Sequence, residues 1–228
     1  MRAVVPVLEL SMAETGPVSA LGLSAPLSLR LLPGECAVIE GADTAQLEAF
    51  ADLCSGLVRL RTGHVRFLGH DWAALPDEFA AALRGRIGRV FGTIASLPFL
   101  DAETNLLLSQ LHHTRYVRDE LRAEATALAY EFGLPGIPQG RLGDLAPEDA
   151  LRGMLIRAFL GKPMLLLLEE PAIGFRAALL NRIAGIRDRG GGVIWLIRSR
   201  MTRDAQPFGA TQWLRLTENG FAAVRSAA

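Results

Sequence analysis

Residues 164–171 read Met164-Leu165-Leu166-Leu167-Leu168-Glu169-Glu170-Pro171, an apolar run that ends in two carboxylates and a proline. A short run of this kind is typical of a strand that is buried on both faces in the middle of a parallel sheet. Open α/β sheets bind their ligands at the carboxyl ends of such strands. We therefore expect Glu169 and Glu170 to lie at a ligand-binding edge of a sheet.

An amphipathic helix is predicted directly before this strand, over residues 147–161. One face of it carries the apolar residues Leu151, Met154, Leu155, Ala158 and Phe159. Proline in the first turn and glycine after the last turn are common limits of a helix. The sequence therefore predicts a helix that turns into a buried strand.

This helix and strand resemble the corresponding unit of the ATP-binding cassette ATPases, the nucleotide-binding subunits of ABC transporters. In that family a signature loop, usually Leu-Ser-Gly-Gly-Gln, opens the helix. The strand ends in Asp-Glu-Pro, which provides the Walker B aspartate and the catalytic glutamate. In this chain Glu169 and Glu170 hold those two places, and the signature loop corresponds to Leu145, Ala146, Pro147, Glu148 and Asp149.

The resemblance covers about residues 7–224 and implies an α/β fold of the P-loop NTPase-like ABC ATPase type. Such a fold has a mostly parallel core sheet, an N-terminal antiparallel β-subdomain and a helical subdomain. We expect one domain over residues 1–228. Within it, residues 1–92 would form the β-subdomain and the first half of the core, 93–150 the helical subdomain, and 151–228 the second half of the core. Residues 1–40 contain no aromatic side chain that could stack on adenine, as the family usually has there.

The composition excludes several classes of protein. The 24 acidic and 24 basic residues cancel, which argues against a nucleic-acid partner. No apolar run approaches the roughly 20 residues of a membrane-spanning helix, and the N-terminus lacks a signal peptide, so a cytoplasmic chain is expected. Cys36 and Cys54 have no metal-ligand spacing and are predicted to be buried thiols, so we expect no metal site.

Residues 41–50 stand where the family has its phosphate-binding loop. Such a loop needs glycines whose N–H groups wrap the phosphates, a lysine for the β/γ oxygens and a Ser/Thr for magnesium. Gly41 holds the first glycine's place, but Thr44 and Gln46 hold the places of the other two glycines. The lysine is replaced by Leu47 and the magnesium-binding hydroxyl by Glu48. Lysine occurs only at residue 162, so no nearby shift of register restores the motif.

A structural interpretation of the same loop is favoured over residual phosphate binding. Asp43 followed by Gln46 three positions later is a capping-box pattern, in which the protein's own carboxylate satisfies the helix N-terminus. That N-terminus would otherwise hold phosphate. Leu47, Phe50 and Cys54 continue a buried helical face after the cap.

Two further family positions differ. The glutamine that senses magnesium and the attacking water is replaced by Gly92, and the switch histidine by Ser199.

We assign no role to His112 and His113, and interpret His64 and His70 as surface or turn residues. The arginines between residues 176 and 203 are interpreted as a solvated face, with a surface for an acidic partner as the alternative.

The signature loop also lacks its phosphate-binding groups. Ala146 has no hydroxyl, and Pro147 has no N–H group. Glu148 and Asp149 favour a helix start but would repel an anionic nucleotide.

In the family, the stretch after the Gln position docks a coupling helix of the membrane subunit. Residues 97–100 are apolar enough for that role, and equally for a subdomain core.

These observations predict a degenerate, non-hydrolysing nucleotide-binding-domain subunit of an ABC transporter, peripheral to the inner membrane. The resemblance implies a membrane permease as partner, and a homo- or heterodimer with an ATPase subunit. Glu170 keeps the general base's position, but one carboxylate cannot supply the charge stabilisation that phosphoryl transfer needs. We expect no cofactor, with ATP and magnesium binding weakly at most. The alternatives are an interaction or regulatory protein outside transport, and a weak ATPase with non-consensus ligands.

Overall fold

The structure is a computed structural model that describes residues 4–16, 19–93, 95–169, 176–198 and 209–224. Its elements, in chain order, are β1 (Leu8–Thr15), β2 (Leu27–Leu31), β3 (Cys36–Gly41), α1 (Thr44–Cys54), β4 (Leu60–Phe67), β5 (His70–Asp71), the 3-10 turn η1 (Trp72–Ala74), α2 (Asp77–Arg84), β6 (Ile87–Val90), α3 (Ala102–His113), α4 (Arg118–Glu131), the 3-10 turn η2 (Leu142–Asp144), α5 (Pro147–Phe159), β7 (Leu165–Glu169), α6 (Arg176–Asp188), β8 (Gly192–Arg198), β9 (Gln212–Thr217) and β10 (Gly220–Ala223).

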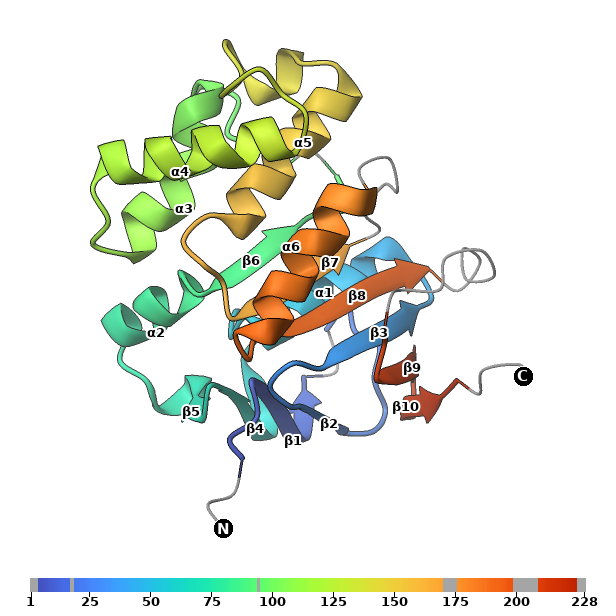
Figure 1. The fold of residues 1–228 in the computed structure, drawn as a ribbon. Helices are drawn as coiled ribbons and strands as arrows, with labels where there is room; N and C mark the ends of the chain where they lie inside the picture. Colours follow the sequence, from blue (N-terminus) through green and yellow to red (C-terminus); the bar gives the residue numbers. More distant parts are fainter. Residues whose placement is uncertain (1–3, 17–18, 94, 170–175, 199–208, 225–228) are drawn as a thin grey trace.

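The larger sheet has the order β10-β9-β3-β8-β7-β6 and is mostly parallel (Figure 1). Strands β9, β3, β8, β7 and β6 run parallel, and β10 pairs with β9 as an antiparallel hairpin. β7 lies between β8 and β6, and each of its five residues is buried. The expectation of a strand that is buried on both faces, in the middle of a parallel sheet, is confirmed.

The smaller sheet is antiparallel and has the order β2-β1-β4-β5. It contains the N-terminal strands of the antiparallel β-subdomain that the resemblance implied. Buried and exposed residues alternate along the whole length of β2, as in a strand with one face on the core. The structure therefore has both parts of the predicted β architecture, a mostly parallel core and an N-terminal antiparallel sheet.

Two hydrophobic clusters lie on opposite faces of the larger sheet. Leu165 and Leu167 of β7 belong to the cluster that the antiparallel sheet and α1 cover. Leu166 and Leu168 belong to the cluster that α3, α4, α5 and α6 cover. Successive side chains of a strand point to opposite faces, so an all-leucine strand supplies both clusters at once.

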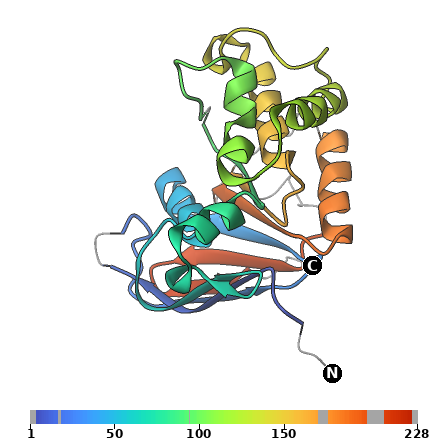
Figure 2. The same ribbon diagram turned by 90° about the vertical axis from the view of Figure 1, so that its left-hand side faces the viewer.

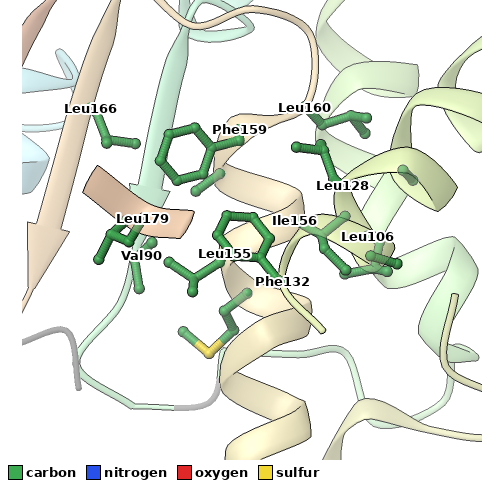
Figure 3. Packing of buried hydrophobic residues seen from close by; sticks show 14 of the residues in the cluster. Val90, Leu106, Leu128, Phe132, Leu155, Ile156, Phe159, Leu160, Leu166 and Leu179 are labelled. Carbon is green, nitrogen blue, oxygen red and sulfur yellow. The ribbon is translucent and has the colours of Figure 1, made fainter. Parts of the chain in front are cut away.

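Helices α3, α4 and α5 gather on one side of the two sheets (Figures 1 and 2). Figure 3 shows Leu155, Ile156 and Phe159 of α5 between these helices and the sheet. The Phe159 ring lies 5.8 Å, centroid to centroid, from that of Phe132. The division that we expected at residue 150 falls inside α5, which packs on α3, α4 and β6 alike.

Among the described residues, none of the helices is both long and apolar enough to cross a membrane. Both cysteines are buried, as predicted, and burial raises the pKa of the Cys36 thiol to about 11.

The predicted solvated face of arginines is only partly solvated. Arg182 of α6 pairs with Glu131 of α4, and Arg187 donates to the Gly34 carbonyl. These contacts attach α6 to its neighbours.

Candidate functional site

The loop between β3 and α1 is closed by its own side chains. Asp43 is the N-cap of α1, and its Oδ1 accepts a hydrogen bond of 2.8 Å from the Gln46 N–H group. The return bond differs from a capping box, because Gln46 Oε1 accepts from the N–H group of Ala42 rather than from that of Asp43, at 2.9 Å. The Gln46 amide also donates to the Leu21 carbonyl, which connects the loop to the segment between β1 and β2. The predicted self-capping is therefore present, with the return bond moved by one residue.

Leu47 stands at the lysine position and belongs to the core. Its side chain is 1% exposed and packs directly against Gly41, the last residue of β3. A Cβ atom on Gly41 would lie 2.5 Å from Leu47 Cδ2, so this contact requires glycine at that position. The side chain is therefore part of the buried cluster that includes Phe50.

Glu169, at the carboxyl end of β7, is 2% exposed and has a partner for each oxygen. Its Oε1 accepts from Arg89 Nε at 2.5 Å, and its Oε2 accepts from the Gly92 N–H group at 3.3 Å. Burial raises the pKa of the Glu169 carboxyl, the Arg89 charge opposes that rise, and the nearby charge of Glu48 adds to it. The residue predicted at the Walker B position thus forms an ion pair within the chain.

Arg89 connects several parts of this site. Its Nη1 pairs with Asp52 of α1, and its Nη2 donates to the Glu48 carbonyl at 3.3 Å. The sequence patterns did not indicate a role for Arg89. The available signal was a charged residue at the centre of a strand, between Gly88 and Val90, which are both buried.

The fold brings four of the predicted site residues together. Thr44, Glu48, Gly92 and Glu169 share one region at the end of β7, because a Cβ atom on Gly92 would lie 3.8 Å from Thr44 Cγ2 and 3.9 Å from Glu169 Cβ. Glu48 reaches the same region through its carbonyl and its charge. The general-base position Glu170 and the switch position Ser199 lie outside the described residues.

The signature-loop residues lie elsewhere, at the start of α5 in the helical part of the molecule (Figure 1). Ala146 is the N-cap without a side-chain cap bond, and Pro147 is the first helical residue. Glu148 and Asp149 lie in the first turn of α5, as the predicted helix start required. Arg152 pairs with both carboxylates, at 3.0 and 2.7 Å, because i,i+3 and i,i+4 neighbours meet on a helix surface.

A groove of about 670 Å³ lies between β6 and α3, and we call it the β6–α3 groove. Its lining residues are Ile87, Arg89, Phe91, Ala95, Ser96, Leu97, Asn105, Leu108, Ser109, His112, His113 and Arg157. The Arg89 and Arg157 guanidinium carbons lie 4.3 and 5.3 Å from the Phe91 ring centroid, within cation–π range. Of the apolar stretch 97–100 singled out from the sequence, Leu97 lines this groove, together with His112 and His113, for which no role was predicted.

The described residues contain no cluster of three or more histidine, cysteine or acidic side chains that could hold a metal ion. His64 and His70 were interpreted as surface or turn residues, and both are exposed in the structure. The Nδ1 atom of His64 contacts Asp71 Oδ2. The pair arises because β4 and β5 are antiparallel neighbours.

Comparisons with known proteins agree with this architecture. No protein-family model matches the chain. The cytochrome c biogenesis ATP-binding export protein CcmA of Bordetella parapertussis is 31% identical over 217 residues, which cover 93% of this chain and 92% of that protein. The lipoprotein-releasing system ATP-binding protein LolD of Pseudomonas fluorescens is 31% identical over 159 residues, 69% of each chain.

A solved structure of an ATP-binding subunit of an ABC transporter has the same fold. It superposes with a TM-score of 0.79 at 20% identity, over 97% of this chain and 90% of that chain. The match to CcmA extends over nearly the whole of both chains, at an identity that shows common membership. The chain therefore belongs to the family of ATP-binding subunits of ABC transporters.

Proposed function

We propose that this chain is a non-hydrolysing subunit of an ABC transporter that holds a membrane permease and pairs with an ATPase subunit at the cytoplasmic face of the membrane. The observation that carries the proposal is the Arg89–Glu169 pair. An ABC ATPase needs the Walker B carboxylate for magnesium and a lysine for the phosphates. Here the guanidinium of Arg89 takes the place of an external cation beside Glu169.

The loop after β3 supports the same conclusion. A phosphate-binding loop works because its N–H groups point at the ligand without internal partners. In this chain the N–H groups of Ala42 and Gln46 are bonded to side chains of the loop itself. Leu47 is buried and cannot extend a charge toward a phosphate. Binding a nucleotide would require these internal bonds to break before any new one formed.

The assembly part of the proposal has support from relatives. CcmA is named an export protein and LolD a component of a lipoprotein-releasing system. A dimeric structure of a bacterial ABC transporter cassette has the same fold, with a TM-score of 0.76 at 16% identity. We propose that this chain likewise acts as half of a dimer, and that its contribution to transport is to hold the permease rather than to hydrolyse ATP.

Titration calorimetry of the purified chain with Mg-ATP tests the proposal. We expect a dissociation constant no tighter than about 1 mM, which corresponds to about 4 kcal/mol, and no turnover. Leu47→Lys alone should not restore binding, because Thr44, Gln46 and Glu48 still differ from the phosphate-loop pattern. Arg89→Gln, which frees Glu169, should not restore it either. A micromolar dissociation constant for the unaltered chain would overturn the proposal.

A further inference from the structure

Another cavity, of about 520 Å³, lies at the amino ends of the parallel strands β6 and β7, and we call it the basic pocket. Three cations line it: Arg86 before β6, Arg115 after α3 and Lys162 before β7. The Arg86 carbonyl accepts from the Met164 N–H group at 2.8 Å, which holds the turn after α5 beside the start of β6. The basic pocket is therefore at the opposite edge of the sheet from Glu169, which ends β7.

The chain does not balance the charge of the basic pocket. None of its three cations forms an ion pair with a described residue, and all three are exposed, so a ligand can reach them. One carboxylate adjoins the pocket, because Glu124 of α4 accepts from the N–H group of the lining residue Gly161 at 3.3 Å. Positive charge remains in excess, and cations that face one cavity attract an anion into it.

The kinds of cation favour a phosphate over a carboxylate. A guanidinium presents N–H donors in a fork that matches two phosphate oxygens, and an ammonium acts as a compact point charge. A phosphate monoester carries up to two negative charges and three acceptor oxygens, whereas a carboxylate has one charge and two oxygens. Two arginines and a lysine around one cavity therefore indicate a phosphate monoester as the ligand.

The cavity also has room and polar groups for more than a phosphate ion. Its volume falls within the range of pockets that bind small organic molecules, and the half-exposed ring of Tyr116 forms part of its wall. Gln110 is 3% exposed and donates through Nε2 to the carbonyl of the lining residue Gly85 at 3.0 Å. Gln110 Oε1 is buried without a hydrogen-bond partner among the described residues.

This unpaired oxygen borders on the wall of the basic pocket. A Cβ atom on Gly161 would lie 2.2 Å from Gln110 Oε1, and Gly161 lines the pocket. A buried acceptor without a donor is costly, so this one is suited to a hydroxyl group that the ligand brings. The ligand should therefore carry a hydroxyl as well as a phosphate.

The backbone at Lys162 points to a use for its side chain. Lys162 has a φ of 55°, in the left-handed region that residues other than glycine rarely adopt. Glycine would fit this conformation at no steric cost, yet the chain has its single lysine here. The choice of residue is therefore explained by the ammonium group in the pocket and not by the backbone.

We propose that the basic pocket binds a phosphate monoester of a small hydroxylated molecule of the glycerol phosphate type. The phosphate pairs with Arg86, Arg115 and Lys162, and a hydroxyl of the ligand donates to Gln110 Oε1. The inference goes beyond the proposed function and does not depend on it, since binding is measured on the chain alone. The same chemical group occurs on soluble metabolites and on lipid headgroups.

Titration calorimetry of the purified chain with glycerol 3-phosphate is the first test. We expect a dissociation constant of about 100 μM or tighter, and binding of inorganic phosphate that is about 10-fold weaker or more. Sedimentation with phosphatidylcholine vesicles that contain lysophosphatidic acid is the second arm. Binding of glycerol 3-phosphate alone assigns a soluble ligand, and binding to the vesicles assigns a lipid headgroup; either supports the inference. Binding of neither probe, or equal affinity for inorganic phosphate, would overturn it.

Two arginine variants test the location of the site. Arg115→Gln should weaken binding of the successful probe by about 10-fold or more, because a charged hydrogen-bond donor is lost from the pocket. Arg122→Gln, which removes an exposed arginine of α4 outside the pocket, is the matched control and should leave the affinity unchanged. Equal losses in the two variants would mean that the probe responds to surface charge in general, and would overturn the inference.

Lys162→Gly separates binding from folding. Glycine suits the left-handed backbone, so the denaturation midpoint should not fall, whereas the affinity for the probe should fall by about 10-fold. A purely structural role for Lys162 predicts the reverse, a lower midpoint with unchanged affinity. That result would overturn the inference.

Discussion

Single side chains decide what the end of β7 can do. Leu47, which the resemblance places at the lysine position, packs in the core, and Asp43 accepts a hydrogen bond from the N-terminus of α1. Arg89 supplies a cation to Glu169 from a strand 80 residues away in the sequence. Each of these three side chains has its contacts within the folded chain. Together they produce a site in which the protein satisfies its own charges.

The cap of α1 can be measured on its own. Asp43→Ala should lower the free energy of unfolding by about 1 kcal/mol, because the Gln46 N–H group loses its acceptor. Asp43→Asn should change it little, since asparagine caps helices equally well. Glu78→Ala, an exposed acid in the first turn of α2 without a cap bond, is the control. Urea denaturation gives the comparison, and an unchanged midpoint for Asp43→Ala would mean that the cap is not formed.

His113 makes the stability of the chain depend on pH. Burial lowers the pKa of His113 below its ordinary value of 6.5, and the charges of His112 and Arg84 lower it further. The unfolded chain therefore binds a proton near pH 6.5 that the folded chain does not bind, so stability is complete above that pH and falls below it. From about pH 8 to about pH 5.5, the wild-type chain should lose stability relative to His113→Gln. Parallel stability curves for the two proteins would contradict this prediction.

At the scale of elements, β6 connects the Arg89–Glu169 ion pair with the β6–α3 groove. Arg89 of β6 pairs with Glu169 and also lines the β6–α3 groove, which contains Arg157 of α5. The strand can lie this close to α5 because Gly88 has no side chain. A Cβ atom there would lie 2.0 Å from the Ala158 carbonyl oxygen. The position of Arg89 between core and groove therefore depends on a backbone contact.

Gly88→Ala tests that contact. The added methyl group must displace the α5 backbone, so we expect a loss of about 2 kcal/mol or more in the free energy of unfolding. Gly92→Ala is the matched control, because its Cβ atom would meet its nearest neighbours at 3.8 and 3.9 Å, an ordinary contact distance. Thermal denaturation of the two variants should separate them clearly. Similar midpoints would show that β6 can shift without cost.

At the scale of the whole molecule, we expect Glu170, at the predicted general-base position, to take no part in ATP hydrolysis. Glu170 lies outside the described residues, and the sequence places it at the general base. We expect Glu170→Gln to leave transport by the assembled complex unchanged, because this chain has neither a phosphate-loop lysine nor a magnesium-binding hydroxyl at the family positions. The matching change in the partner ATPase should abolish transport. Loss of transport from Glu170→Gln in a folded chain would mean that this chain is catalytic.

The sequence by itself determined the local features. Five buried residues of β7, the helix before them and the cap at Asp43 all follow from short patterns of apolar and polar residues. The absence of lysine from residues 41–50 is also read directly from the sequence, and folding cannot change it. Such features depend on periodicities of two or 3.6 residues, which are visible within one segment.

Only the tertiary structure decided which distant residues meet. The Arg89–Glu169 pair exists because β6 and β7 are parallel neighbours, and the sequence shows neither strand order nor register directly. The β6–α3 groove is formed by a strand, the loop after it and two helices, and Arg157 lies in it only when these elements are packed together. Burial and charge pairing are properties of that arrangement, so Arg89 and Arg157 look like ordinary surface arginines until the chain is folded.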